Sequence, residues 1–173
     1  LEKMNRTYTR EWYLDKVDRI REIIPEIAIS TDIITGFCSE TDEEHQDTVS
    51  LMKDVVYDYA YMFYYSERPG TLAAKKYEDD VPLEVKKKRL TEIIEIQNGS
   101  NLTTNTACVG QTQLVLVEQR SKRSADDLSG RTSQYRTVVF PKENYEPGQY
   151  VNVKINSCTS GTLIGEAVGL HKF

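Results

Sequence analysis

The feature that most constrains the fold is a strand, a helix and a second strand within 40 residues. The segment IAISTDIITGF (27–37) is β-branched and largely apolar, which predicts a strand covered on both faces. Thr41 and Glu44 form a capping-box pattern, which predicts a helix over roughly 42–56. The segment YDYAYMFYYS (57–66) predicts the next strand. Such a unit has parallel strands and a right-handed crossover, so this part of the chain is predicted to be α/β.

Two loops follow the predicted strands, GFCSET (36–41) and SERPGT (66–71), and parallel strands place both at the same edge of the sheet. Ligands bind at this carboxyl edge in α/β barrels and in open α/β sheets. Asp32 lies in the first strand, and a buried carboxylate there either faces a ligand or has a structural partner. Arg68 could bind a carboxylate or phosphate of a ligand, or pair with a neighbour such as Glu67. The tyrosines of the second strand are predicted to pack rather than to take part in chemistry; they are Tyr57, Tyr59, Tyr61, Tyr64 and Tyr65.

Two more helices are expected around this unit. The first covers 10–24 and stops at Pro25, and its apolar stripe consists of Tyr13, Val17, Ile20 and Ile24. The second begins at Pro82, and NGSN (98–101) is expected to close or interrupt it. Its inner face is predicted to hold Leu83, Leu90, Ile93, Ile94 and Gln97. The four consecutive cations at 86–89 are predicted to form its solvated face, with phosphate contact as the alternative.

Several classes of protein are disfavoured by what the sequence does not contain. No apolar run approaches the ~20 residues of a membrane span. The start at Leu1 shows no signal peptide, and two strong strands do not complete a sheet, so we expect a fragment of a longer protein. The cysteines Cys38, Cys108 and Cys158 form no CxxC pair, which argues against a zinc site. Their odd number favours free thiols in a reducing compartment, the cytoplasm.

The end of the chain differs from the beginning in charge and pattern. Residues 1–105 carry 14 Lys/Arg and 21 Asp/Glu, whereas residues 106–173 carry 8 and 6, which suggests two modules with different partners. Short alternating strands are predicted at 112–119, 135–140, 149–157 and 161–168. Their length and spacing favour a small closed β-barrel.

Basic residues gather in this second module, between its first two predicted strands and at the start of the second. They are Arg120, Lys122, Arg123, Arg131 and Arg136, interleaved with hydroxyl and amide side chains such as Ser121 and Gln134 and with Tyr135. Cations with hydroxyl and amide donors hold phosphate oxygens, and an aromatic ring can stack on an unpaired base, so RNA is the partner considered. The alternative is a basic surface loop without a partner.

Longer segments resemble a known family. ISTDIITGFCSETDEEHQDTVSLM, YDYAYMFYYSERPGTLAAK and VPLEVKKKRLTEIIEIQN are similar to the C-terminal half of the radical-SAM domain of the methylthiotransferases. VGQTQLVLVEQRSKRSADDLSGRTSQYRTVVFP and GQYVNVKINSCTSGTLIGEAVG resemble the TRAM domain that closes those proteins. Among the branches of the family, YSERPGT, SKRS and GRTSQYRTVVF look most like the one that modifies tRNA. The branch that modifies an aspartate of a ribosomal protein is the close sibling.

The resemblance implies an enzyme that adds a methylthio group to carbon 2 of N6-isopentenyladenosine next to the tRNA anticodon. It implies S-adenosylmethionine and two 4Fe–4S clusters as cofactors and the tRNA anticodon stem-loop as partner. One cluster is held by CxxxCxxC and the other by three cysteines of an N-terminal domain; neither set is present here, so this segment alone is expected to be inactive. A non-catalytic TRAM-type RNA-binding protein is the alternative from another class.

The resemblance also implies a fold for each part. Residues 1–106 are expected to be the C-terminal βα units of a partial α/β (TIM-like) barrel. Residues 107–173 are expected to form a five-stranded antiparallel TRAM β-barrel that binds RNA.

Site residues carry over only where the motifs match. IITGFCSE resembles the radical-SAM motif that approaches the adenine of S-adenosylmethionine, which implicates Ile34, Gly36 and Glu40. Asp32 stands where the general motif has glycine, which leaves its role open. Arg68, within YSERPGT, is a candidate for contact with substrate or cofactor. The candidates for the anticodon-stem backbone are Ser121, Lys122, Arg123, Arg131 and Arg136. No catalytic or metal-binding residue is assigned in this segment.

Overall fold

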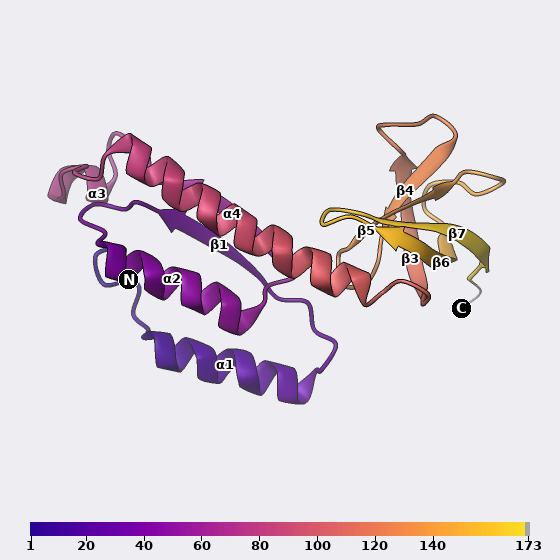
Figure 1. Cartoon of the computed structure of the whole chain (residues 1–173), viewed down its shortest axis with the longest axis horizontal. Helices are drawn as coiled ribbons and strands as arrows, with labels where there is room; N and C mark the ends of the chain where they lie inside the picture. Colours follow the sequence, from indigo (N-terminus) through magenta and orange to yellow (C-terminus); the bar gives the residue numbers. More distant parts are fainter. Residues whose placement is uncertain (172–173) are drawn as a thin grey trace. The chain divides into compact units, whose positions relative to one another are not determined.

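The structure is a computed structural model that describes residues 1–171. The chain divides into two compact units, Leu1–Gln97 and Asn98–Phe173 (Figure 1). Each unit has its own hydrophobic cluster. Among the described residues, no helix combines the length and the apolar character that crossing a membrane requires.

The first unit contains the predicted strand–helix–strand arrangement. Its elements are α1 (Arg10–Ile23), β1 (Ser30–Thr35), α2 (Asp42–Val55), β2 (Tyr59–Tyr64), α3 (Leu72–Lys76) and the first part of α4 (Leu83–Thr106). β1 and β2 pair in parallel, from Ser30 opposite Tyr59 to Thr35 opposite Tyr64. The Thr41 hydroxyl accepts the Glu44 backbone N–H, and the Glu44 carboxylate accepts the Thr41 N–H, which confirms the capping box.

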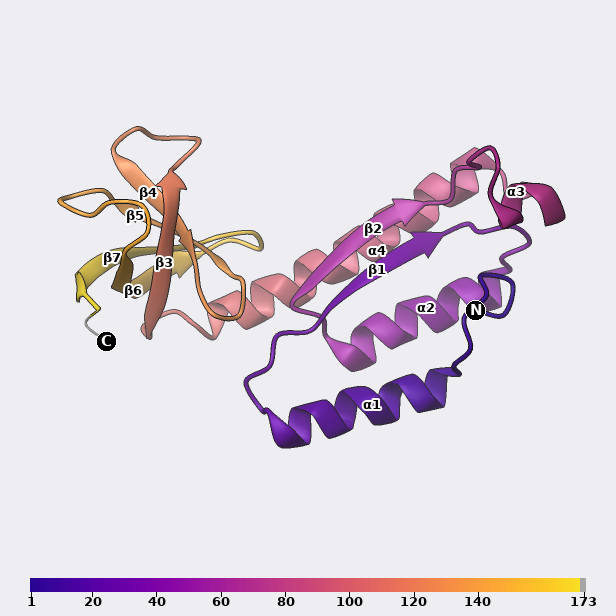
Figure 2. The ribbon, with the colours of Figure 1, turned by 180° about the vertical axis from the view of Figure 1, so that it is seen from behind.

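One face of the two-stranded sheet is packed and the other is open. The core of this unit consists of Val17, Ile33, Val49, Met52, Val55, Tyr57 and Ile93. Ile34 on the opposite face is 45% exposed, so the prediction that β1 is covered on both faces is wrong. α4 lies behind the sheet (Figure 2), so it covers one face only. The opposite face therefore retains exposed aromatic side chains. Of the strand tyrosines, Tyr57 and Tyr65 are buried, whereas Tyr59, Tyr61 and Tyr64 are exposed.

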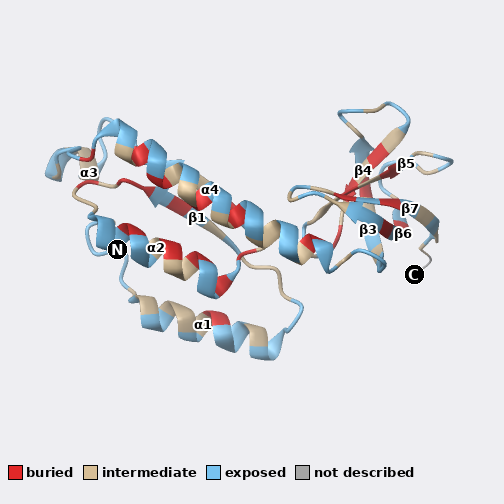
Figure 3. Cartoon of the chain, viewed as in Figure 1, coloured by how far each residue is buried: buried red, intermediate tan, exposed pale blue. Residues whose placement is uncertain are grey.

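α4 departs from its prediction in two ways. Within the first unit its buried positions are Lys86, Arg89, Ile93 and Gln97, three or four residues apart, so they form one face of the helix (Figure 3). The prediction of a solvated cationic run therefore holds for Lys87 and Lys88 but is wrong for Lys86 and Arg89, which are 3% and 6% exposed. The helix also continues through 98–101 to Thr106 instead of closing there. Of the predicted inner face, Ile93 and Gln97 are buried, while Leu83 and Ile94 are exposed.

The second unit is built around a closed barrel of five strands. These are β3 (Thr112–Arg120), β4 (Asp127–Arg131), β5 (Thr137–Pro141), β6 (Tyr150–Cys158) and β7 (Leu163–Leu170), in the order β3-β4-β5-β7-β6. Nine buried apolar side chains fill it, among them Val115, Phe140 and Leu163. Gly130 is required on β4, because a Cβ there would collide with the Leu116 carbonyl oxygen.

The barrel is mixed, so the prediction of an antiparallel barrel is wrong for one pairing. β5 and β7 run parallel, while the other four neighbouring pairs are antiparallel. Directions cannot alternate all the way around a closed ring with an odd number of strands, so at least one pair must be parallel. β4 was not foreseen as a strand, because DLSGR is short and mostly polar.

The last turns of α4 belong to the second unit. The Asn105 amide donates to the carbonyl oxygens of Thr159 and Ser160, at 2.9 and 3.3 Å. Arg136 donates from Nη1 to the Thr104 hydroxyl and to Asn105 Oδ1, both at 3.0 Å. These bonds explain why the helix continues through residues of poor helix propensity, since tertiary contacts override local preference. The compact unit begins at Asn98, and the domain boundary after residue 106 stays a prediction.

Candidate functional site

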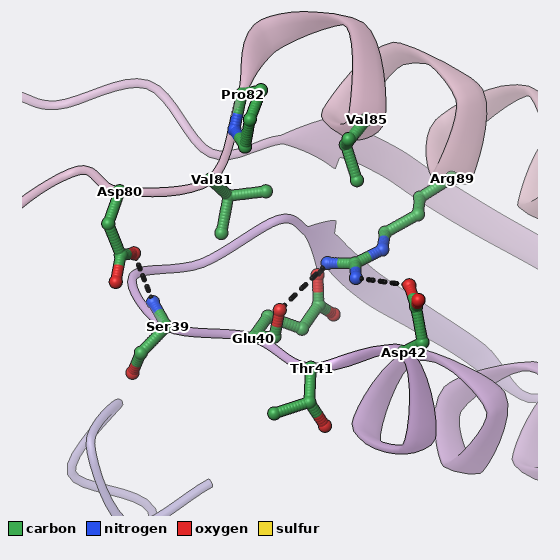
Figure 4. Close-up of a pocket in the computed structure, with 9 residues that line it drawn as sticks. All are labelled: Ser39, Glu40, Thr41, Asp42, Asp80, Val81, Pro82, Val85 and Arg89. Carbon is green, nitrogen blue, oxygen red and sulfur yellow. Dashed lines mark hydrogen bonds and ion pairs between the residues drawn. The ribbon is translucent and has the colours of Figure 1, made fainter.

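An open pocket of about 420 Å³ lies where the loop after β1 meets the start of α4 (Figure 4). Its lining consists of Ser39, Glu40, Thr41, Asp42, Asp80, Val81, Pro82, Val85 and Arg89. The Ser39 backbone N–H donates to Asp80 Oδ1 at 2.6 Å, which ties the loop to the segment before α4. The lining therefore combines three acidic side chains and three apolar ones with the buried cation Arg89.

Arg89 holds the loop through both terminal nitrogens. Nη1 donates to the Glu40 carboxylate at 2.9 Å and to the Glu40 carbonyl oxygen at 3.0 Å. Nη2 donates to Asp42 Oδ1 at 2.7 Å. The hydrogen bond from Arg89, together with its positive charge, holds the pKa of the Asp42 carboxyl below its ordinary value. Burial alone would lower the pKa of Arg89, but its bonds to Asp42 and Glu40 raise it above its ordinary value.

Gly36 is held from two sides at the end of β1. Its N–H donates to the Glu40 carboxylate, and its φ of 67° lies in the left-handed region. A Cβ at this position would collide with Cγ of Lys86. The Lys86 ammonium pairs with Asp79, donates to the Tyr65 carbonyl oxygen at 3.2 Å and lies 5.1 Å from the centre of the Tyr65 ring. The glycine thus allows the stem of a buried lysine to lie directly against the backbone.

Asp32 and Ile34 lie on the open face of the sheet. In the parallel register Asp32 is opposite Tyr61 and Ile34 is opposite Phe63. All four are exposed, so the premise that Asp32 is buried is wrong. Its role as a ligand contact stays a prediction.

Arg68 is also exposed, in the loop after β2. Its carbonyl oxygen accepts the Thr71 backbone N–H at 3.3 Å and the Thr71 hydroxyl at 2.9 Å, while that hydroxyl caps α3. Within residues 1–171 no hydrogen bond or ion pair involves its guanidinium, so the alternative of a pair with Glu67 is not realised. The loop fixes the backbone of Arg68 and leaves its side chain in solvent.

The basic residues of the barrel lie in two separate places. Lys122 and Arg123 are exposed in the loop that joins β3 to β4, where the Ser121 hydroxyl accepts the Arg123 backbone N–H at 3.3 Å. In the region that the structure describes, neither cationic side chain has an ion pair. Arg131 lies at the other end of β4, since Leu128 is opposite Arg120 and Arg131 is opposite Leu116.

Arg131 and Arg136 are already engaged within the barrel unit. The guanidinium of Arg131 pairs with Glu118 at 3.4 Å and lies 4.0 Å from the centre of the Tyr135 ring. Arg136 is half-buried and bound to the end of α4. Lys122 and Arg123 are therefore the more available cations.

Lys86 and Arg89 contribute to the site at the carboxyl end of β1, and sequence reasoning did not predict them there. A signal for them existed, because both lie on the same helical face as Ile93, which was predicted to point inward. The prediction treated the four cations at 86–89 as one solvated group, and this grouping obscured the helical periodicity.

Comparison with known proteins identifies both units. The model of the family described as "TRAM domain" matches residues 106–168. The chain is 56% identical over 170 residues to the tRNA-2-methylthio-N(6)-dimethylallyladenosine synthase of Flavobacterium johnsoniae, covering 98% of this chain. It is 54% identical over 167 residues to the synthase of that name from Amoebophilus asiaticus, covering 96%. The chain belongs to the methylthiotransferase family. It spans 35% and 34% of the lengths of these two relatives, or about a third.

The cofactors of a methylthiotransferase fit this segment only in part. The exposed Ile34 side chain offers an apolar contact that suits an adenine ring, such as that of S-adenosylmethionine. The carboxylate, carbonyl oxygen and N–H of Glu40 are all engaged within the protein, so its contribution to a ligand site would be to support the turn that follows β1. Among residues 1–171, no three His, Cys, Asp or Glu side chains are grouped to hold a metal ion. The side chains of the described residues therefore do not offer a ligand set for an iron–sulfur cluster.

Proposed function

We propose that this chain is the C-terminal part of a tRNA methylthiotransferase, which adds a methylthio group to carbon 2 of N6-isopentenyladenosine next to the anticodon. The observation that carries the proposal is an identity of 56% over 98% of the chain to a relative whose name states a closely related reaction. The identity extends over both units, so it concerns the α/β part as well as the TRAM barrel.

In this proposal the first unit supplies βα units of the radical-SAM domain, a partial α/β barrel. Ile34 and Gly36 would approach the adenine of S-adenosylmethionine, with Glu40 supporting the turn between them and α2. Asp32 would face the interior from the same sheet face as Ile34, and Arg68 would reach substrate or cofactor from the next loop. The two 4Fe–4S clusters would be held by other parts of the complete protein, which would work in the cytoplasm, and the segment alone would be inactive.

The TRAM barrel would hold the anticodon stem-loop through its phosphates. The support is the pair of exposed cations Lys122 and Arg123, beside the Ser121 hydroxyl. Contacts to phosphates fix the register of an RNA without reading its sequence, which suits an enzyme that must deliver one base to a distant centre. Arg131 and Arg136 would contribute less, because both have partners within the protein.

The test is binding of this chain to a tRNA anticodon stem-loop across a range of salt concentrations. Each phosphate contact releases counterions, so we expect the logarithm of affinity to fall linearly with the logarithm of salt concentration. Replacing Lys122 and Arg123 with alanine should lower affinity and make that slope shallower by about 1–2. The matched control replaces Lys87 and Lys88, which are also exposed, lie on α4 and change the net charge by the same amount.

Three outcomes would contradict parts of the proposal. Binding to a ribosomal protein but not to RNA would support the sibling methylthiotransferase that acts on protein. Equal loss of affinity in the control would show that net charge, rather than the β3–β4 loop, drives association. A complete protein that binds RNA but never modifies it when loaded with its cofactors would support a non-catalytic RNA-binding role.

A further inference from the structure

The buried face of α4 is polar where it meets the strand ends. Lys86 and Arg89 occupy positions that a helix packed only for stability fills with apolar residues, as Ile93 does one turn later. Burying a paired cation is often no more stabilising than burying an apolar side chain of similar volume. The two cations are therefore poorly explained by stability alone, and their partners point to another role.

The partners of Arg89 all belong to the loop after β1 and the start of α2. Its two terminal nitrogens donate to the carboxylate and carbonyl oxygen of Glu40 and to the carboxylate of Asp42. Its Nε is buried and has no hydrogen-bond partner among the described residues. The planar guanidinium is thus directed at one loop. Its Nε–H remains unpaired in this orientation, at a cost in free energy.

The hold on Glu40 passes directly to Gly36. The Glu40 carboxylate that binds Arg89 also accepts the Gly36 N–H, and the Glu40 N–H donates to the Phe37 carbonyl oxygen at 2.9 Å. The turn from Gly36 to Glu40 is therefore closed by two hydrogen bonds and fastened to α4 through one carboxylate. Lys86 packs against the other side of Gly36.

We infer that Arg89 is a positioning residue: acting through Glu40, it fixes the Gly36 turn and with it the strand end that carries Ile34. The inference rests on the proposed function, in which this strand end contacts the adenine of S-adenosylmethionine. Arg89 itself need not touch the cofactor. Lysine cannot replace it, because an ammonium is a point charge that does not reproduce the fork spanning Glu40 and Asp42.

The first test uses this chain and needs no cofactor. In Arg89→Lys, hydrogen exchange of the Gly36 amide should accelerate roughly tenfold, since the carboxylate that accepts it loses its fixed orientation. The amide of Met52, buried within α2, should exchange at the wild-type rate. The matched control is Lys87→Ala on the exposed side of α4, which should leave both amides unchanged. Equal acceleration at Gly36 and Met52 would show general destabilisation and overturn the inference.

The second test uses the complete protein and S-adenosylhomocysteine, an unreactive analogue, measured by calorimetry. Arg89→Lys should weaken its binding about tenfold, or about 1.4 kcal/mol, with tRNA affinity unchanged. Lys87→Ala should bind both as the wild type does. If the wild type and Arg89→Lys bind the analogue equally, the inference fails while the proposed function stands. If the wild type itself does not bind the analogue, the proposed function fails and the inference with it.

Discussion

At the scale of single residues, Gly36 shows how one position can have two independent requirements. Its φ of 67° is costly for any other residue, and the stem of Lys86 occupies the space where a Cβ would lie. A glycine at a strand end allows the backbone to approach a neighbour closely, so a close contact at Gly36 could be suspected from the sequence. Its partner could not be foreseen, because Lys86 lies 50 residues later and was assigned to solvent.

We predict opposite effects for two glycine-to-alanine substitutions. Gly36→Ala should lower the free energy of unfolding by about 1–3 kcal/mol, through left-handed strain and displacement of Lys86. Gly99→Ala should raise it by about 0.5–1 kcal/mol, because Gly99 lies within α4 and a Cβ there meets nothing. Urea denaturation of both variants measures the difference. Equal stability of Gly36→Ala and the wild type would contradict the geometry described for the strand end.

Asp42 provides a prediction about pH. The hydrogen bond from Arg89 and its charge lower the pKa of the Asp42 carboxyl below the ordinary value of 3.8, so the charged form stabilises the fold. That contribution is fully present above the unfolded-state pKa and is lost as the pH falls through the lowered pKa of the folded state. The wild type should therefore be more stable than Asp42→Asn near neutral pH, with the difference disappearing under acid conditions below pH 3.8. Denaturation of both proteins over a pH series measures this difference, which a pH-independent gap would contradict.

At the scale of elements, α4 shows where local patterns stop being sufficient. Its start at Leu83, directly after Pro82, and its inward-facing Ile93 and Gln97 followed from proline placement and periodicity. Its end did not, since NGSN has poor helix propensity and only the bonds from Asn105 and Arg136 to their barrel-unit partners explain the extra turns. The barrel shows the same limit. Its closure was predicted from the short alternating strands, whereas the sequence of β4 was too polar to be predicted as a strand.

We predict that the barrel unit requires the end of α4. A protein comprising residues 98–173 should unfold at higher urea concentration than one comprising 107–173. The shorter protein loses the buried Asn105 and its hydrogen bonds to the carbonyl oxygens of Thr159 and Ser160, at a cost of about 0.5–1.5 kcal/mol for each bond.

The single substitution Asn105→Ala in residues 98–173 serves as the internal comparison. It should reproduce part of the loss, because the side chain that links α4, Arg136 and the β6–β7 turn is removed while the helix remains. If residues 107–173 were as stable as 98–173, the last turns of α4 would be dispensable, and the boundary after residue 106 would describe the folding unit better.

At the scale of the whole molecule, the charge asymmetry was the sequence property that most directly indicated two modules. Residues 1–97 carry 14 Lys/Arg and 21 Asp/Glu, while residues 98–173 carry 8 and 6. The two compact units of the structure follow this division. Charge and patterning could not reveal that one face of the β1–β2 sheet is open. The sequence of a largely apolar strand does not distinguish a sheet covered on one face from a sheet covered on both.

This asymmetry makes a final prediction about RNA binding. The acidic first unit repels an RNA that the basic barrel attracts, so residues 98–173 alone should bind an anticodon stem-loop more tightly than the whole chain at low salt. The repulsion acts over distance and is screened, because the Debye length falls from about 30 Å at about 0.01 M salt to about 3 Å at about 1 M. The two affinities should therefore converge as salt is added, which fluorescence anisotropy measures with both proteins and one labelled RNA. Tighter binding by the whole chain at every salt concentration would mean that the first unit contacts RNA favourably, despite its charge.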